Sequence, residues 1–339
     1  MPQYIYRVEA IETVECVDSS VRYARLEAVG DVDGLSRSLR LKMPDAQLGD
    51  YVVLTTSYLS DTEIQSFGHM AKIGRRLHFL HHYDRPNQGD VLSGPYRYFD
   101  FGDYARISWD KQILKGEQIP FRNGDTIVIG GGIFFMRDKP RLNKLLARAG
   151  DVIGWGIGID QRLDPATEVV SHFSLVGTRE RSCELIDNRK VFYVPCVSCM
   201  HEVFSFTSGE GDGIALHLNG GFNEKTIRTT FPGVRETTTV SPFVEIIDNL
   251  RSAYCLVTNS YHGAYWGSLL GKRVICVATR IPKWSGLHPA VVVVSDVGEA
   301  LAAVDKAKPV PAEYREECRN LNQAFYNRVM ARLNDKRVV

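Results

Sequence analysis

The chain has 339 residues, seven cysteines and a formal net charge of +1 at pH 7. This length predicts two or three domains, and the nearly balanced charge argues against nucleic acid as a bulk partner. The sequence shows no signal-peptide pattern and no apolar run near the roughly 20 residues that span a bilayer. We therefore expect no transmembrane segment. An odd number of scattered cysteines is typical of reduced thiols, so we expect the protein to be cytoplasmic.

The first part of the chain, residues 1–70, is predicted to form a β-rich accessory module. Polar and apolar residues alternate there in four short runs separated by turn residues, at 4–15, 21–30, 35–43 and 50–56. Ser60 followed by Glu63 is a capping pattern, which predicts a connecting helix over 60–74. Contact with an acceptor and a part in assembly are both open roles for this module.

Residues 71–208 are predicted to form a first Rossmann-like domain. Short apolar runs, typical of strands that are covered on both faces, alternate there with polar loops and helices. The strand candidates lie at 75–83, 125–132, 151–160 and 190–196, and the segment 173–186 is predicted to be a strand, a turn and a helix. This alternation predicts a parallel, doubly wound sheet.

Residues 209–310 show the same alternation and predict a second Rossmann-like domain. A strand candidate at 213–221 precedes an amphipathic helix whose start at Ser241 and Pro242 fits the preferences for those positions. A strand–helix–strand unit follows over 255–278, and then a strand at 290–296 and a helix at 297–307.

The remaining residues, 311–339, are predicted to form a C-terminal helix. Its larger apolar side chains fall on one stripe: Tyr314, Cys318, Leu321, Phe325, Val329 and Leu333. Because the stripe is narrow and acidic residues are interspersed, we expect the helix to dock on its own protein. Peripheral contact with a membrane surface is the alternative for this basic helix.

The unit at 255–278 predicts an anion site. A buried strand runs into a polar turn with Asn259, Ser260 and His262, and Gly263 then opens a small, apolar helix. In open α/β sheets the carboxyl ends of strands bind ligands, and a helix start adds N–H groups and a positive dipole end. These features suit a phosphate or a carboxylate beside a histidine.

Three further loops follow predicted strands and would lie at the same kind of edge. They are the Asn87–Asp90 segment, the triple glycine Gly130, Gly131 and Gly132, and the alternating glycines Gly154, Gly156 and Gly158. None forms a dinucleotide-binding fingerprint, and the sequence contains no P-loop, zinc-protease or serine-hydrolase motif. Close packing of helix and strand is the structural alternative for such glycines, and turn capping is the alternative for Asn87 and Asp90.

Cys196 and Cys199 form a C-x-x-C pair. A structural zinc site needs two more ligands at matching spacing, and only His201 lies near in the sequence. A redox site needs the pair to open a helix in a strand–helix–strand context. We therefore prefer two cysteines that pack a loop, and we expect no metal site.

Four segments, three of them in or next to these loops, occur in an order that resembles the polysaccharide pyruvyl transferase family. The resemblance covers about 75–310 and rests on NQGD, DTIVIGGG, LVGTRERS and VTNSYHGAYWGSLLGKRVI, in that order. It implies an α/β fold of two Rossmann-like doubly wound domains, similar to the GT-B glycosyltransferases, with the β-rich module outside. It also implies transfer of a pyruvyl group from phosphoenolpyruvate to hydroxyls of a glycan or a lipid-linked oligosaccharide, forming a ketal without a cofactor.

The resemblance assigns individual residues. His262 and Gly263 match the family's His-Gly pair, while Arg179 and Ser182 match its Arg-Asp-x-x-Ser element, in which Glu180 replaces the aspartate. Many members carry an arginine at the position of Ser260. This chain must supply that cation elsewhere, and the candidates are Arg181, Lys272, Arg280 and Lys283.

The expected chemistry uses these residue types. Arg179 would pair with the donor carboxylate, His262 would bind phosphate or protonate the enol carbon, and Asp90 or Glu180 would accept a hydroxyl proton. We expect further donor contacts from Asn259, Ser260, Tyr261, Gly263, Lys272 and Arg181. Acceptor contacts are expected from Asn87, Gly89, Gly130, Gly131 and Gly132.

Two other functions fit the same domains. One is a glycosyltransferase that uses a nucleotide sugar, and the other is a glycan-binding relative without catalysis. The absence of an acidic residue between His262 and Asp296 argues against the first, and Ser260 in place of arginine favours the second.

Overall fold

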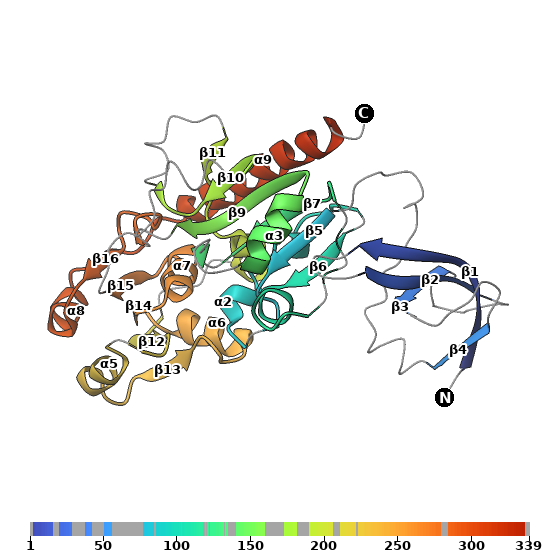
Figure 1. The fold of residues 1–339 in the computed structure, drawn as a ribbon. Coiled ribbons are helices and arrows are strands. Elements are labelled where there is room, and N and C mark those ends of the chain that lie inside the picture. Colours follow the sequence, from blue (N-terminus) through green and yellow to red (C-terminus); the bar gives the residue numbers. More distant parts are fainter. Residues whose placement is uncertain are drawn as a thin grey trace.

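The fold was analysed in a computed structural model (Figure 1). It describes residues 3–15, 20–28, 38–42, 51–55, 77–84, 86–102, 104–117, 119, 121, 123–131, 133–134, 140–159, 173–181, 190–205, 211–221, 223–278 and 284–335. The helix predicted at 60–74, and the predicted helical part of 182–186, lie outside these residues.

The N-terminal strands form an antiparallel sheet of their own. Its order is β3-β2-β1-β4, with β1 (Gln3–Glu15), β2 (Ser20–Ala28), β3 (Ser38–Lys42) and β4 (Tyr51–Thr55). All four strands predicted from the alternating pattern are present. The register of β1 against β2 shifts between Val8 and Ala10, as a bulge requires.

The second sheet is parallel and has the order β11-β10-β9-β7-β5-β6. Its strands are β5 (Leu77–His81), β6 (Ala105–Ser108), β7 (Thr126–Gly130), β9 (Asp151–Ile159), β10 (Leu175–Thr178) and β11 (Val191–Tyr193), and β8 (Ile133–Phe134) pairs with β9. Helix α3 (Pro140–Arg148) packs on it through Leu142, Leu145 and Leu146. Short helical turns follow three of the strands: α2 (Gln88–Val91), a π-helical turn at Trp109–Leu114 and a 3-10 turn at Val197–Met200.

The third sheet is also parallel, in the order β13-β12-β14-β15-β16. It contains β12 (Ile214–Leu218), β13 (Arg235–Thr238), β14 (Cys255–Thr258), β15 (Arg273–Val277) and β16 (Val292–Val294). Its helices are α5 (Glu224–Thr230), α6 (Phe243–Ser252), α7 (Tyr261–Leu269) and α8 (Val297–Ala303). The structure is therefore an α/β fold with two parallel sheets, compatible with two Rossmann-like domains.

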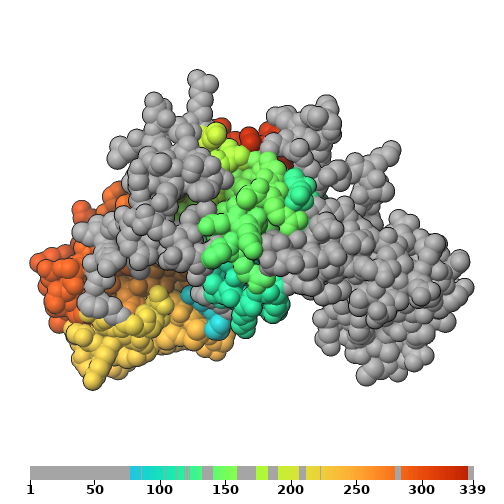
Figure 2. All heavy atoms as spheres, in the orientation of Figure 1, coloured from blue at the N-terminus to red at the C-terminus, as the bar shows by residue number. Residues whose placement is uncertain are grey.

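The two parallel sheets meet through short contacts. The N–H of Gln88 in α2 donates to the carbonyl of Thr239, which follows β13, at 2.8 Å. In the space-filling view the cyan residues of the first parallel sheet adjoin the yellow-to-orange residues of the second (Figure 2). The loop after β5 therefore lies against the second parallel sheet.

Helix α9 (Glu313–Asp335) joins the cores of both parallel sheets (Figure 1). Tyr314 and Cys318 pack in the core around α7, whereas Phe325, Val329 and Leu333 pack on the first parallel sheet. The prediction of a helix docked on its own protein is confirmed. Among the described residues, no helix has the length and apolarity that crossing a membrane requires.

Replacing Arg332 with alanine is expected to lower the free energy of unfolding by about 2 kcal/mol. The Arg332 guanidinium donates from Nε and Nη2 to the carboxylate of Asp151 at 2.7 and 3.1 Å, and the Asp151 side chain is fully buried. Urea unfolding would measure the loss. Asn334→Ala, on the exposed side of the same helix, is the matched control, and an equal effect of both variants would contradict the prediction.

Candidate functional site

The start of helix α7 is fixed by the turn that follows β14. Ser260 is the N-cap, where its Oγ accepts the N–H of Gly263 at 3.3 Å while its own N–H donates to Thr258 Oγ1 at 2.9 Å. A serine at this position satisfies a helix N–H group that arginine would leave to solvent or ligand. Ser260, the position at which the resemblance expected an arginine, therefore has a structural role here.

Gly263 lets α7 pack close to the sheet. A Cβ at this position would lie 2.5 Å from Cδ2 of His217 and 2.7 Å from Thr258 Oγ1. Every residue of α7 is buried, so the helix cannot move outward to make room. Gly263 thus sets how closely α7 approaches the sheet, while His262 supplies an imidazole.

His262 lies where three elements meet. Its ring packs against Gly89 of α2, where any Cβ would overlap the imidazole near Nδ1. Its Nε2 is 3.6 Å from Sγ of Cys196, which follows β11, and its ring centroid is 5.5 Å from that of Trp266. The histidine is only 8% exposed, so little of its ring reaches solvent.

The loop after β5 is held in place by Asn87. As the N-cap of α2, its Oδ1 accepts the N–H of Gly89 at 3.0 Å and that of Asp90 at 3.4 Å. Asn87 therefore caps a turn that presents Gly89 to His262. The carboxylate of Asp90 is partly exposed and close enough to Cys196 to act on the pKa of its thiol.

Arg179 is a buried cation at the end of β10. Its guanidinium carbon lies 4.1 Å from the ring centroid of Tyr261, the first residue of α7, and the side chain is almost fully buried. Its Nε has no hydrogen-bond partner among the described residues, and the nearest carboxylate oxygen, from Glu180, is 4.0 Å away. The cation is therefore stacked but incompletely paired.

Gly158 leaves room for this guanidinium. A Cβ there would lie 2.7 Å from Nη2 of Arg179, which explains one of the alternating glycines of β9. The Tyr261 hydroxyl is also buried without a partner among the described residues. Burial raises the pKa of Tyr261 well above its usual value, and the nearby Arg179 charge acts in the opposite direction. Two buried donor groups thus meet at the start of α7.

The glycines at the end of β7 support the turn that contains α2. A Cβ on Gly130 would lie 3.1 Å from Pro95 Cδ and from the carbonyl oxygen of Ser93, and one on Gly131 would overlap Ser93. Gly131 also has a φ of 67°, which favours glycine. Both residues pack against the segment that follows α2, and Gly132 lies outside the described residues.

Three predicted donor contacts are engaged elsewhere. Asn259 accepts from and donates to the backbone of Asn219, at 2.7 and 3.1 Å, and so ties β14 to β12. Lys272 donates to the carbonyl of Arg251 at 2.9 Å, beyond the C-terminal end of α7. Arg181 pairs with Glu317 of α9 at 2.7 Å. Ser182, Arg280 and Lys283 lie outside the described residues.

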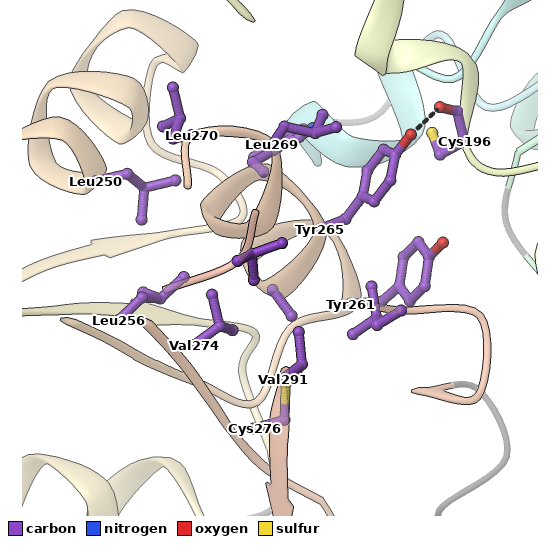
Figure 3. Close-up of a cluster of buried hydrophobic side chains, with 14 of the residues drawn as sticks. Cys196, Leu250, Leu256, Tyr261, Tyr265, Leu269, Leu270, Val274, Cys276 and Val291 are labelled. Atoms are coloured by element: carbon purple, nitrogen blue, oxygen red, sulfur yellow. Dashed lines mark hydrogen bonds between the residues drawn. The ribbon is translucent and has the colours of Figure 1, made fainter. Parts of the chain in front are cut away.

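The C-x-x-C pattern singled out Cys196, but it did not indicate that this residue contacts His262. Its thiol contacts His262, and its carbonyl accepts the hydroxyl of Tyr265 at 2.8 Å (Figure 3). Cys199 is also a buried free thiol and accepts from Asn322 at 3.4 Å. Within the described part of the chain, no group of three or more histidine, cysteine or acidic side chains could hold a metal ion.

Replacing Gly89 with alanine is expected to displace the imidazole of His262, because the added methyl group overlaps the ring. The free energy of unfolding should fall by about 1–3 kcal/mol, as overpacking usually costs. Nuclear magnetic resonance would show the shifted His262 signals. Gly220→Ala is the control, since a Cβ there lies 3.6 Å from a flexible glutamate oxygen. Unchanged His262 signals in the Gly89 variant would contradict the described contact.

Comparisons with known proteins give little beyond this geometry. No family model matches the chain, and no curated protein does. A functionally uncharacterised protein from Klebsiella pneumoniae subsp. pneumoniae is similar in structure at 15% identity with a TM-score of 0.45, over 66% of this chain and 93% of that one. The wall teichoic acid polymerase TagF soaked with CDPG is similar at 8% identity with a TM-score of 0.29, over 75% of this chain and 84% of that one.

A second structure of a TagF variant gives 10% identity and a TM-score of 0.30, with the same shares of 75% and 84%. These likenesses are too weak to carry an argument about function. What is inferred about this protein therefore rests on its own two parallel sheets and on the buried, partly unpaired groups of Arg179 and Tyr261 between them.

Proposed function

We propose that the chain transfers a pyruvyl group from phosphoenolpyruvate to hydroxyls of a glycan or glycan precursor. The observation that carries this proposal is the buried Arg179 guanidinium, whose Nε has no partner among the described residues at the start of α7. An incompletely paired buried cation is costly unless an anion completes it. The resemblance to pyruvyl transferases then suggests which anion.

Phosphoenolpyruvate fits the chemistry of this place. It is small and carries both a carboxylate and a phosphate, so it needs a planar cation and further donors nearby. Arg179 offers a guanidinium fork for the carboxylate, while the positive end of the α7 dipole and the imidazole of His262 favour the phosphate. The Tyr261 hydroxyl adds a donor beside Arg179. With Ser260 as the N-cap, Arg179 is the main cation of the proposed donor site.

The proposed reaction starts with protonation of the enol carbon, which produces an oxocarbenium-like centre. A sugar hydroxyl attacks this centre and gives up its proton, and phosphate then leaves. A second hydroxyl can close the ketal. The two acceptor hydroxyls balance the protons: one of theirs replaces the proton taken up by this carbon, and the other leaves with the phosphate. Asp90 is the better base of the two carboxylates, because it is partly exposed, whereas Glu180 is buried next to Arg179.

The acceptor would enter from the side of the first parallel sheet, where α2 presents Asn87 and Asp90. We propose a glycan or a lipid-linked oligosaccharide as this acceptor, with the reaction taking place in the cytoplasm. A cofactor or metal ion has no part in the proposed scheme.

Incubation with phosphoenolpyruvate and a panel of glycan acceptors tests the proposal. We expect phosphate release that depends on the acceptor, and a mass gain on the acceptor equal to one pyruvyl ketal. Turnover of a nucleotide sugar in place of phosphoenolpyruvate would establish a glycosyltransferase instead. Acceptor binding without turnover of either donor would establish a glycan-binding relative.

A further inference from the structure

We propose that a chain of buried hydrogen bonds, from Trp266 through Ser198 and Cys196, holds neutral His262 as the tautomer with its proton on Nδ1. Cys196 is thereby a positioning residue for His262. The chain joins α7 to the turn after β11 and returns to α7. Its links measure 3.1, 3.3 and 3.6 Å in that order.

The direction of the chain is set at Trp266. An indole N–H can only donate, so Nε1 of Trp266 gives its hydrogen to Oγ of Ser198. The Ser198 hydroxyl still has its own hydrogen to place. Ser198 is fully buried, and among the described residues the Sγ of Cys196 is the one acceptor within reach of that hydrogen.

The same argument then applies to Cys196. Since Sγ accepts from Ser198, its S–H is left to donate to the remaining neighbour, Nε2 of His262. A nitrogen that accepts a hydrogen bond carries no proton in the neutral ring, so the proton is on Nδ1. That atom lies on the side of the ring that faces Gly89.

Burial keeps the Cys196 thiol of this hydrogen-bond chain protonated. It raises the pKa of the Cys196 thiol, and hydrogen bonds from Ser198 together with the Arg179 charge oppose the rise. The thiol therefore retains the hydrogen that it donates. Its position is fixed from the backbone side, because the Tyr265 hydroxyl donates to the Cys196 carbonyl at 2.8 Å (Figure 3).

The tautomer stands on these contacts alone, and its consequence for catalysis rests on the proposed function. A neutral ring protonated at Nδ1 donates a hydrogen bond from that atom and cannot accept a proton there. His262 would therefore hold an anionic oxygen of the donor rather than act as the base for the acceptor hydroxyl. This leaves the base to a carboxylate such as Asp90.

Nitrogen-15 spectroscopy of the full-length protein, labelled at histidine and free of substrate, tests the tautomer directly. Long-range proton–nitrogen correlations at neutral pH should show the pyrrole-type nitrogen of His262 at Nδ1, with His262→Gln identifying the signals. Cys196→Ala should move the proton partly or fully to Nε2, whereas Cys196→Ser, which keeps a donor, should retain Nδ1. Cys255→Ala removes a buried thiol from the other face of the second parallel sheet and should leave the His262 tautomer unchanged.

A wild-type His262 protonated at Nε2 would overturn the proposal, and so would a Cys196→Ala variant whose tautomer is unchanged. The wild-type spectrum decides the question even if the alanine variant fails to fold. In the turnover assay, Cys196→Ala should raise KM for phosphoenolpyruvate about tenfold, and Cys196→Ser should restore it. Absence of turnover in every variant would refute the proposed function and leave the tautomer result intact.

Discussion

Replacing Arg179 with methionine is expected to lower kcat/KM for phosphoenolpyruvate roughly 100- to 1,000-fold, the usual loss when a group that stabilises charge is removed. The same change should alter the free energy of unfolding by less than about 1 kcal/mol. The substitution loses the stacking of the guanidinium on Tyr261, but it also removes an incompletely paired buried charge, so the two effects on stability oppose each other. Initial rates and urea unfolding measure the two effects separately.

Two further variants sharpen this test. Arg179→Lys keeps the charge but not the planar fork, so most of the activity should still be lost. Arg228→Gln removes an arginine that pairs with Glu224 and Glu236 on the surface, and it should retain full activity. Full turnover by the methionine variant would refute the role of Arg179 in donor binding. A collapse in stability would instead assign it a structural role.

Acidification from pH 7 to pH 5 is expected to lower the free energy of unfolding by about 4 kcal/mol through two buried histidines. Burial lowers the pKa of His217 to about 4 and that of His81 to about 3, from a usual value of 6.5. Below pH 6.5 the unfolded chain binds protons that the folded chain does not. The stabilisation is therefore complete above pH 6.5 and is lost as the pH falls toward 4 and 3.

Urea unfolding at a series of pH values measures this slope. Each histidine contributes about 1.4 kcal/mol per pH unit in the steep part of the window. His217→Asn and His81→Asn should each remove about half of the slope, and the double variant should remove most of it. Carboxylates stay largely ionised down to pH 5, so they contribute little in this range. An unfolding free energy that is constant from pH 7 to pH 5 would contradict the burial of neutral rings.

Most strands of the parallel sheets could be predicted because they are buried on both faces and form short apolar runs. Besides the two-residue strand β8 (Ile133–Phe134), two edge strands were not predicted, β6 (Ala105–Ser108) and β13 (Arg235–Thr238). Both are only four residues long and carry polar side chains, with Arg106 in one and Arg235 and Glu236 in the other. An edge strand is paired on one side only, so its sequence does not need a continuous apolar run.

The loops of the site were predictable for a related reason. Carboxyl ends of parallel strands meet at one edge, so the predicted sheet already brings Gly89, Gly130 and Arg179 to one edge of the first parallel sheet. The contact of Cys196 with His262 was not predictable, because it joins the two parallel sheets and the sequence does not specify how their edges face each other. Lys272 and Arg181 were expected at the donor site, but long flexible cations reach nearby carbonyl or carboxylate oxygens, and local sequence does not specify which.

The position of α9 has a consequence for biosynthesis. The indole N–H of Trp155 in β9 donates to Asn322 of α9, across 167 residues, and Phe325 packs edge-on against the same ring. On the ribosome, the first parallel sheet is therefore complete in strands long before this helix is translated. Until then its apolar surface around Phe79 and Trp155 lacks the cover of α9, so we expect the nascent chain to be prone to aggregation over that interval.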